Sequence, residues 1–307
     1  MKRALAIASL LIAGPSIFAA EWTEDFAAAK KSAGESHKDL LIDFTGSDWC
    51  GYCMMLDAEV FKKDEFAKVV PQSFVLVKID SPRDTSRQSP AVREQNTKLS
   101  GIYSVEGLPT VVLADAEGRP YATTGYKEEF ASKPAGWVDH LLSLRKLREG
   151  RDAAFADAAK AEGMEKARRL AKGLKEIDPI WYAAFYKTET DAIRAADPDD
   201  SLGIRETIAD VENAAMFSRK IEALSAKVDA AMAKKDPAAA LKLVDAFVTR
   251  EKPVGENLQT AMSIKVDVLD EGQDDQATIK LIDEIIHIAP DTATAADLRD
   301  LRKEINE

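Results

Sequence analysis

Both cysteines of the chain lie in one tetrapeptide, Cys50-Gly51-Tyr52-Cys53. This spacing could serve a redox-active dithiol, half of a zinc site, or a structural crosslink. Zinc needs about four ligands, and His37, His140 and His287 are scattered without ligand spacing. A crosslink that closes so short a loop removes little entropy from the unfolded chain. The pattern therefore favours a dithiol that exchanges with other disulfides.

The residues around the tetrapeptide place it where a strand ends and a helix begins. Leu40–Thr45 is a short, largely apolar run of strand length, and the apolar residues between positions 54 and 61 recur at helical spacing. The N-terminus of a helix lowers the pKa of a nearby thiol through its unpaired N–H groups and its dipole. We therefore expect Cys50 in the exposed first turn, with Cys53 returning to the same face.

The first twenty residues predict export. Lys2 and Arg3 precede an apolar run from Ala4 to Ala13, and the small residues Ala19 and Ala20 follow. This order is typical of a secretory signal peptide, with an uncleaved N-terminal anchor as the alternative. No other stretch approaches the roughly 20 apolar residues of a membrane helix, so we expect no stable membrane span after cleavage. In the periplasm, or another extracytoplasmic compartment, a disulfide can persist.

The composition favours about two folded domains and disfavours one class of partner. The chain has 307 residues, with 42 Lys and Arg against 53 Asp and Glu, and a formal net charge of -11. Domains usually contain roughly 100 to 200 residues. Binding to a phosphate backbone normally needs a basic face that displaces counterions. We therefore expect no nucleic-acid partner.

Two segments together resemble the thioredoxin superfamily. They are residues 44–53, with the sequence Phe-Thr-Gly-Ser-Asp-Trp-Cys-Gly-Tyr-Cys, and residues 107–110, with the sequence Gly-Leu-Pro-Thr. The first is similar to exported bacterial members with a Gly-Ser-x-Trp-Cys-Gly-x-Cys motif. The resemblance covers about residues 37 to 145. It implies a thioredoxin-like α/β fold, with a central mixed sheet covered by helices, and exchange of disulfides with proteins without a bound cofactor.

The resemblance also implies roles for the residues that match. Cys50 would attack a substrate disulfide, and Cys53 would resolve the mixed disulfide. Pro109 would be a cis-proline facing the pair, with a trans proline that opens an edge strand as the alternative. The backbone of Leu108 would pair with an extended substrate segment.

Three further residues would frame this site. Asp43 would be a buried carboxylate beneath the cysteines, with a pKa raised by desolvation, that relays a proton to and from Cys53. One extra residue separates Asp43 from Cys50 compared with shorter family members, so a purely structural Asp is the alternative. Trp49 would shield one side of the disulfide, and Tyr52 would contact substrate.

The remaining pattern predicts a thioredoxin-like domain over residues 21–148 and an all-α domain over 149–307. The first should contain, after Leu40–Thr45, a strand at 74–80, a helix at 91–99, strands at 110–113 and 121–124, and a helix at 135–147. A linker is expected at Arg148–Asp152, where Gly150 breaks the helical pattern. In the second domain, residues 240–245 echo residues 278–283, which suggests helix pairs in a degenerate repeat.

These features predict an exported thiol-disulfide oxidoreductase, with a reductase favoured over an isomerase. The Gly51-Tyr52 pair is similar to that of periplasmic isomerases, but those enzymes usually carry Thr where this chain has Leu108. A periplasmic reductase would need an electron donor in the membrane. The alternative is a binding or assembly protein, whose helical domain recognises a partner and whose thioredoxin-like module is a scaffold.

Overall fold

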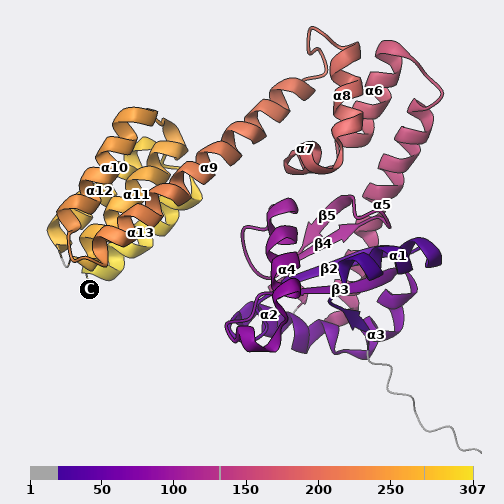
Figure 1. The fold of residues 1–307 in the computed structure, drawn as a ribbon, viewed down its shortest axis with the longest axis horizontal. Helices are drawn as coiled ribbons and strands as arrows, with labels where there is room; N and C mark the ends of the chain where they lie inside the picture. The colour runs from indigo at the N-terminus through magenta and orange to yellow at the C-terminus, as the bar shows by residue number, and fades with distance from the viewer. Residues whose placement is uncertain (1–19, 131–132, 273, 307) are drawn as a thin grey trace, which may run out of the picture. The chain divides into compact units, whose positions relative to one another are not determined.

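The computed structural model describes residues 20–130, 133–272 and 274–306. They form two compact units that divide between Ile208 and Ala209. The expected signal peptide, residues 1–20, lies outside the described residues except for Ala20. The predicted fold class is confirmed, with a mixed sheet between helices followed by an all-helical region (Figure 1).

A mixed sheet forms the centre of the first unit. Its strand order is β1-β3-β2-β4-β5, in which β1, β2 and β3 run parallel while β4 is antiparallel to both β2 and β5. The strands are Trp22–Thr23, Asp39–Thr45, Phe74–Asp80, Thr110–Ala114 and Pro120–Thr124. Every residue of the central strand β2 is buried. Its largely apolar sequence is typical of a strand covered on both faces.

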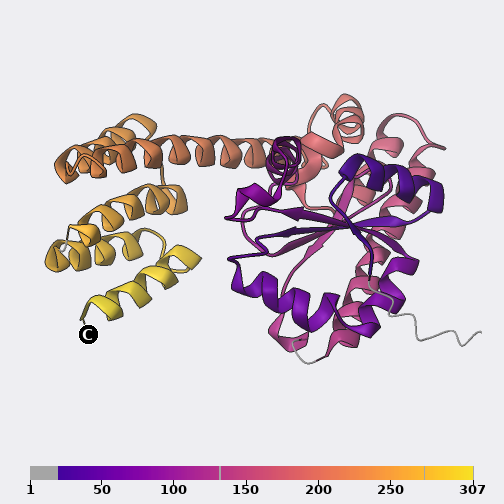
Figure 2. The ribbon, with the colours of Figure 1, turned by 60° about the horizontal axis from the view of Figure 1, so that its bottom comes forward.

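Helices cover both faces of this sheet (Figure 2). On one face lie α1 (Phe26–Ser36) and α4 (Pro90–Ile102), and the ring of Phe26 packs against that of Tyr103. On the other lie α2 (Gly51–Leu56), a π-helical turn (Asp57–Phe61), α3 (Asp64–Val69) and the first part of α5 (Pro134–Ala158). Trp137 of α5 packs there against Phe61 and Phe66. The sheet is thereby closed to solvent on both sides.

The expected linker at Arg148–Asp152 is wrong, because these residues lie inside the continuous helix α5. Gly150 costs a helix only about 1 kcal/mol relative to Ala. Arg151 is 3% exposed, and its guanidinium donates to the Asp115 carboxylate and to the hydroxyl of Tyr186, each at 2.8 Å. Such buried, charge-assisted bonds outweigh the cost of one glycine, so the helix continues.

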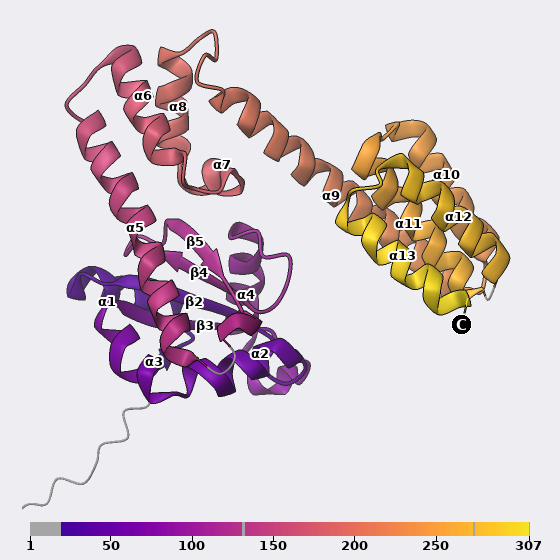
Figure 3. The same cartoon turned by 180° about the vertical axis from the view of Figure 1, so that it is seen from behind.

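A helical extension, residues 159–203, belongs to the first unit. It contains α6 (Gly163–Leu174), a 3-10 turn (Pro179–Trp181), α7 (Tyr182–Phe185) and α8 (Lys187–Ala196). Figure 3 shows α5 running from the sheet to α6 and α8. The hydroxyl of Tyr186 donates to the Pro120 carbonyl at 2.6 Å, and Arg119 pairs with Glu189 at 2.7 Å. The sheet and the extension therefore share one hydrophobic core.

The second unit consists of helices. They are the greater part of α9 (Ile204–Met232), then α10 (Pro237–Glu251), α11 (Gly255–Glu271), α12 (Asp275–Ile288) and α13 (Ala293–Asn306). The repeated segment noted in the sequence falls in α10 and α12. The carboxylates of Asp236 and Asp274 cap these two helices by accepting the N–H groups of Ala239 and Ala277. The echo therefore lies at equivalent positions of two helices, and each copy begins four residues after the capping aspartate.

The described helices give no candidate for a membrane span, since none combines the length and apolarity that crossing a bilayer requires.

Candidate active site

Cys50 and Cys53 form a disulfide at the start of α2. Cys50 is the N-cap of this helix, and its Sγ accepts the N–H of Cys53 at 3.2 Å. The predicted position between strand β2 and a helix is confirmed. The expectation that Cys50 itself is exposed is wrong in the oxidised form, because its Sγ is bonded back to the buried Cys53 and the residue is only 7% exposed.

The same geometry suits a thiolate at Cys50 once the disulfide is reduced. The N–H of Cys53 already points at the Cys50 sulfur, and the first turn of a helix directs partial positive charge to its N-cap. Both effects favour the charged form of a thiol at this position. Cys50 is therefore placed to be the attacking sulfur.

The loop before Cys50 is held in place by the segment after β3. The indole N–H of Trp49 donates to the carbonyl of Ser81 at 2.8 Å. The Asp48 carboxylate accepts the backbone N–H groups of residues 83 and 84 at 2.8 and 2.9 Å, and these bonds lower the pKa of Asp48. A Cβ on Gly46 would lie 2.5 Å from the ring of Trp49. Sequence reasoning singled out Trp49 but missed the anchoring role of Asp48.

Asp43 lies in the central strand and is 3% exposed, with no hydrogen-bond partner for its Oδ1. Burial raises its pKa from 3.8 to about 7. Lys78, its neighbour across the β2–β3 pair, lowers that pKa, whereas Asp57 and Asp80 raise it. A carboxyl group with such a pKa can accept and release a proton near neutral pH. Proton transfer between Asp43 and Cys53 stays a prediction.

A cleft of about 370 Å³ brings together several of the residues expected at the site. It is lined by Tyr52, Leu108, Pro109, Gly125, Tyr126 and Glu128. The Leu108–Pro109 peptide bond is cis. A Cβ on Gly125 would lie 2.8 Å from the carbonyl oxygen of Pro109. Only glycine therefore lets the end of β5 approach the proline so closely.

Two residues of this region, Tyr126 and Glu59, were not predicted from the sequence. The ring of Tyr126 lies 5.5 Å from that of Tyr52, centroid to centroid, and its hydroxyl donates to Glu59 at 3.3 Å. Desolvation and the Glu59 carboxylate raise the pKa of Tyr126. Glu59 lies in the π-helical turn after α2, a feature that is frequent at functional sites. No local pattern links residues 67 positions apart, so the sequence offered no signal for this pair.

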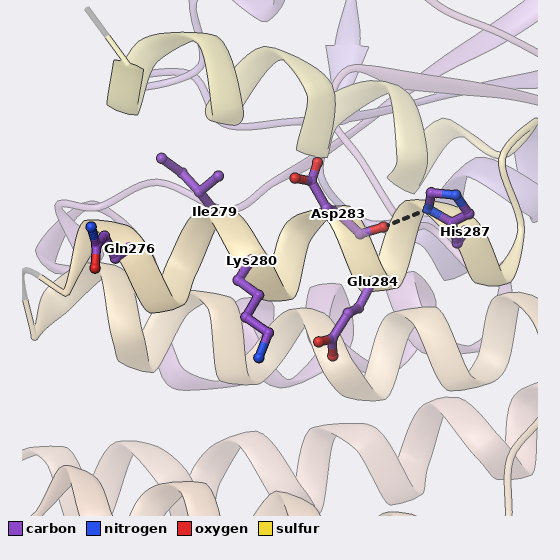
Figure 4. A pocket seen from close by; sticks show the side chains of 6 residues that line it. All are labelled: Gln276, Ile279, Lys280, Asp283, Glu284 and His287. Atoms are coloured by element: carbon purple, nitrogen blue, oxygen red, sulfur yellow. Dashed lines mark hydrogen bonds between the residues drawn. The ribbon is translucent and has the colours of Figure 1, made fainter.

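A larger, open hollow of about 730 Å³ lies along α12 in the second unit (Figure 4). Its lining residues are Gln276, Ile279, Lys280, Asp283, Glu284 and His287. The ring of His287 is hydrogen-bonded to the backbone carbonyl of Asp283. No cysteine contributes to this hollow, and no group of metal-ligating side chains occurs among the residues that the structure describes.

Comparison with known proteins points to one family. A model of the thioredoxin-like domain matches residues 26–132. The disulfide bond reductase DsbH of Chlamydia pneumoniae is 31% identical over 128 residues, covering 42% of this chain and 74% of the relative. The thioredoxin-related protein DsbJ of the same organism is 32% identical over 158 residues, covering 48% of this chain and 45% of the relative. A solved structure titled DsbH oxidoreductase aligns with 29% identity and a TM-score of 0.40, covering 46% of this chain and 96% of its own.

Proposed function

Since the chain belongs to the thioredoxin superfamily and is a thiol-disulfide oxidoreductase, we propose that it is an exported reductase of disulfides in other proteins. One arrangement supports this function above all. The Cys50–Cys53 disulfide lies at a helix N-terminus, and Tyr52, from between the two cysteines, lines a cleft together with Leu108 and Pro109. A substrate cysteine beside the disulfide would therefore have a surface that receives the adjoining polypeptide.

The reduced enzyme would act in two exchanges. The Cys50 thiolate attacks one sulfur of the substrate disulfide, which forms a mixed disulfide and releases the other substrate sulfur as a thiolate. Cys53, once deprotonated, attacks the Sγ of Cys50 and releases the second substrate thiolate. Two electrons pass from the enzyme to the substrate, and the enzyme is left as the Cys50–Cys53 disulfide. The chemistry is carried by these two thiols alone.

Asp43 would take the proton from Cys53 in the second exchange. Its pKa of about 7 suits that task, because the group is partly ionised near neutral pH. The protonated carboxyl is also the form that burial favours. A proton accepted from Cys53 would therefore stabilise Asp43 in its buried position.

The direction of electron flow is proposed on two grounds. The relative that shares 31% identity is named a disulfide bond reductase. In addition, Leu108 stands where the isomerases of the superfamily usually have Thr. An exported reductase must be reduced again after each cycle, so we include a dithiol electron donor in the membrane. The signal-like N-terminus supports a periplasmic location.

The function is tested with reduced full-length protein and a protein disulfide such as that of insulin. Wild type should reduce the substrate, and Cys50→Ser should abolish the reaction because the attacking sulfur is gone. Cys53→Ser should instead accumulate a mixed disulfide at Cys50 that dithiothreitol releases. Substrate reduction by Cys50→Ser at the wild-type rate would refute the mechanism.

A further inference from the structure

A second cleft, of about 310 Å³, lies beside the cis-proline loop and is built jointly by the thioredoxin-like fold and the helical extension. Glu106 and Gly107 contribute from the loop, Thr110 from β4, Thr124 from β5, and Asp178 and Ile180 from the extension. Figure 1 shows α7, which follows these last two residues, at the end of the sheet that carries β4 and β5. The extension therefore reaches the region where a substrate would bind.

Buried contacts fix this wall of the cleft. Trp181 is 2% exposed, and its indole N–H donates to the carbonyl of Tyr103 at 3.1 Å. The rings of Tyr103 and Phe185 lie 4.9 Å apart, centroid to centroid. The Asp178 carboxylate accepts the N–H of Ile180 at 3.0 Å, which orders the turn that leads to Trp181. The contacts of Trp181 and Phe185 with Tyr103 thus hold Asp178 and Ile180 next to the loop that begins at Ser104.

The residues that line the two clefts are neighbours in two segments of the chain. Leu108 and Pro109 of the loop line the first cleft, whereas Gly107, just before them, and Thr110, the first residue of β4, line the second. After β5, Gly125 lines the first cleft and Thr124 the second. A polypeptide that pairs with the backbone of Leu108 would therefore pass next to Gly107, which lines the second cleft.

The charged residues that line the two clefts all have one sign. Glu128 is the charged residue among those described for the first cleft, and Glu106 and Asp178 are those of the second. Lys and Arg do not occur among these lining residues. The remaining lining of the second cleft combines threonine and serine hydroxyls with the apolar side chains of Val105 and Ile180, the aromatic residues Tyr103 and Trp181, and Gly107. The surface complements an extended segment that carries positive charge.

We propose that the helical extension is a specificity element, and that the second cleft binds a positively charged, extended segment of the substrate protein next to its reactive cysteine. This inference rests on the proposed function, because the segment is brought to the cleft by the exchange at Cys50. Ile180 supplies apolar contact, while Glu106 and Asp178 select for lysine or arginine. The extension would thereby favour a subset of disulfide substrates.

The test uses reduced full-length protein and three disulfides. Two are disulfide-linked peptide dimers of equal length, whose single cysteine is flanked by lysines in one and by glutamates in the other. The third is bis(2-hydroxyethyl) disulfide, which is neutral and too small to reach the second cleft. The readout is the second-order rate constant for oxidation of the protein. Wild type should react faster with the lysine peptide, and added salt should reduce this preference.

Two variants that each remove one negative charge test whether the preference for the lysine peptide arises in the second cleft. Asp178→Asn keeps an oxygen that can accept the N–H of Ile180, and Glu106→Gln is nearly isosteric. Each should lower the rate with the lysine peptide by about two- to fivefold and leave the rate with the small disulfide unchanged. Glu117→Gln is the matched control, because this exposed residue lies in the turn at the other end of the β4–β5 hairpin. It should keep the wild-type preference.

Equal wild-type rates with the two peptides would overturn the inference, and so would loss of the preference in Glu117→Gln to the same degree as in Asp178→Asn. Both results leave the proposed function intact as long as the small disulfide still reacts through Cys50. Failure of the reduced wild-type protein to react with any of the three disulfides would instead refute the proposed function itself. The two failures are therefore distinguishable.

Discussion

The indole of Trp181 donates a hydrogen bond to the backbone carbonyl of Tyr103 across 78 positions of the sequence. This bond joins the helical extension to the segment that leads into Leu108 and Pro109. Because both partners are buried, the bond is protected from water, and its loss leaves a carbonyl without a partner. The extension and the thioredoxin-like sheet should therefore unfold together.

Trp181→Phe tests this coupling. The ring is largely kept, so the expected loss in the free energy of unfolding is about 1 to 3 kcal/mol, from the unpaired carbonyl and the smaller side chain. Urea unfolding followed by far-UV circular dichroism measures it. Trp49→Phe is the control, since it removes an indole bond to the carbonyl of Ser81 at a residue that is 41% exposed. Water can replace that bond, so a loss there as large as at Trp181 would contradict the account.

The pKa of Asp43 makes stability depend on pH. The folded chain holds a proton on Asp43 up to about pH 7, whereas the unfolded chain releases it near the ordinary value of about 4. Between these values the folded state binds more protons, so stability falls as pH rises, and the loss is complete above the folded pKa. Each pH unit of the shift corresponds to about 1.4 kcal/mol.

Asp43→Asn should remove this dependence. The free energy of unfolding of the oxidised variant should exceed that of wild type by more at about pH 8 than at about pH 5, because only wild type must bury a charge at the higher pH. Urea titrations at the two pH values give the difference. Asp48→Asn, at an exposed carboxylate whose pKa is lowered, should change stability equally at both. A constant offset for Asp43→Asn would show that Asp43 is not the titrating group.

Gly125→Ala tests the packing of β5 against the cis-proline loop. The added methyl group would lie 2.8 Å from the Pro109 carbonyl oxygen, which is backbone and must move. We expect the rate of substrate reduction to fall by about tenfold or more, because small displacements of a binding surface are costly to reaction rates. The rate with insulin as substrate measures this effect.

Gly150→Ala is the matched glycine control for that variant. A Cβ there meets nothing within 4 Å, and the residue lies inside α5. The change should leave the rate unaltered and stabilise the protein by about 0.5 to 1 kcal/mol. Destabilisation by Gly150→Ala would mean that α5 is interrupted there, as the sequence had suggested.

The sequence predicted best what local patterns determine. The run Leu40–Thr45 and the spacing of apolar residues after Cys53 located the disulfide between a strand and a helix. Helix α1 was missed because its buried residues, Ala29 and Ala33, are small and give only a weak apolar pattern. The linker prediction failed because it weighed Gly150 alone, while the bonds of Arg151 to Asp115 and Tyr186 come from distant parts of the chain.

The candidate site was predicted only in part, because local patterns identify some of its residues but not the contacts between distant segments. Cys50, Cys53 and Pro109 carry a recognisable motif, and the burial of Asp43 follows from its place in an apolar strand. The contacts of Tyr126 with Tyr52 and Glu59, and the approach of Asp178 to the loop before Pro109, depend on how the elements pack. Such contacts join segments that share no pattern in the sequence.

The reduction potential of the Cys50–Cys53 pair tests the proposed direction most directly. Full-length protein is equilibrated with dithiothreitol redox buffers, and the reduced fraction is counted by alkylation of its thiols. A reductase should give a value near about -270 mV, like thioredoxin. A value between about -200 and -120 mV would place the pair with isomerases and oxidants and would contradict the account.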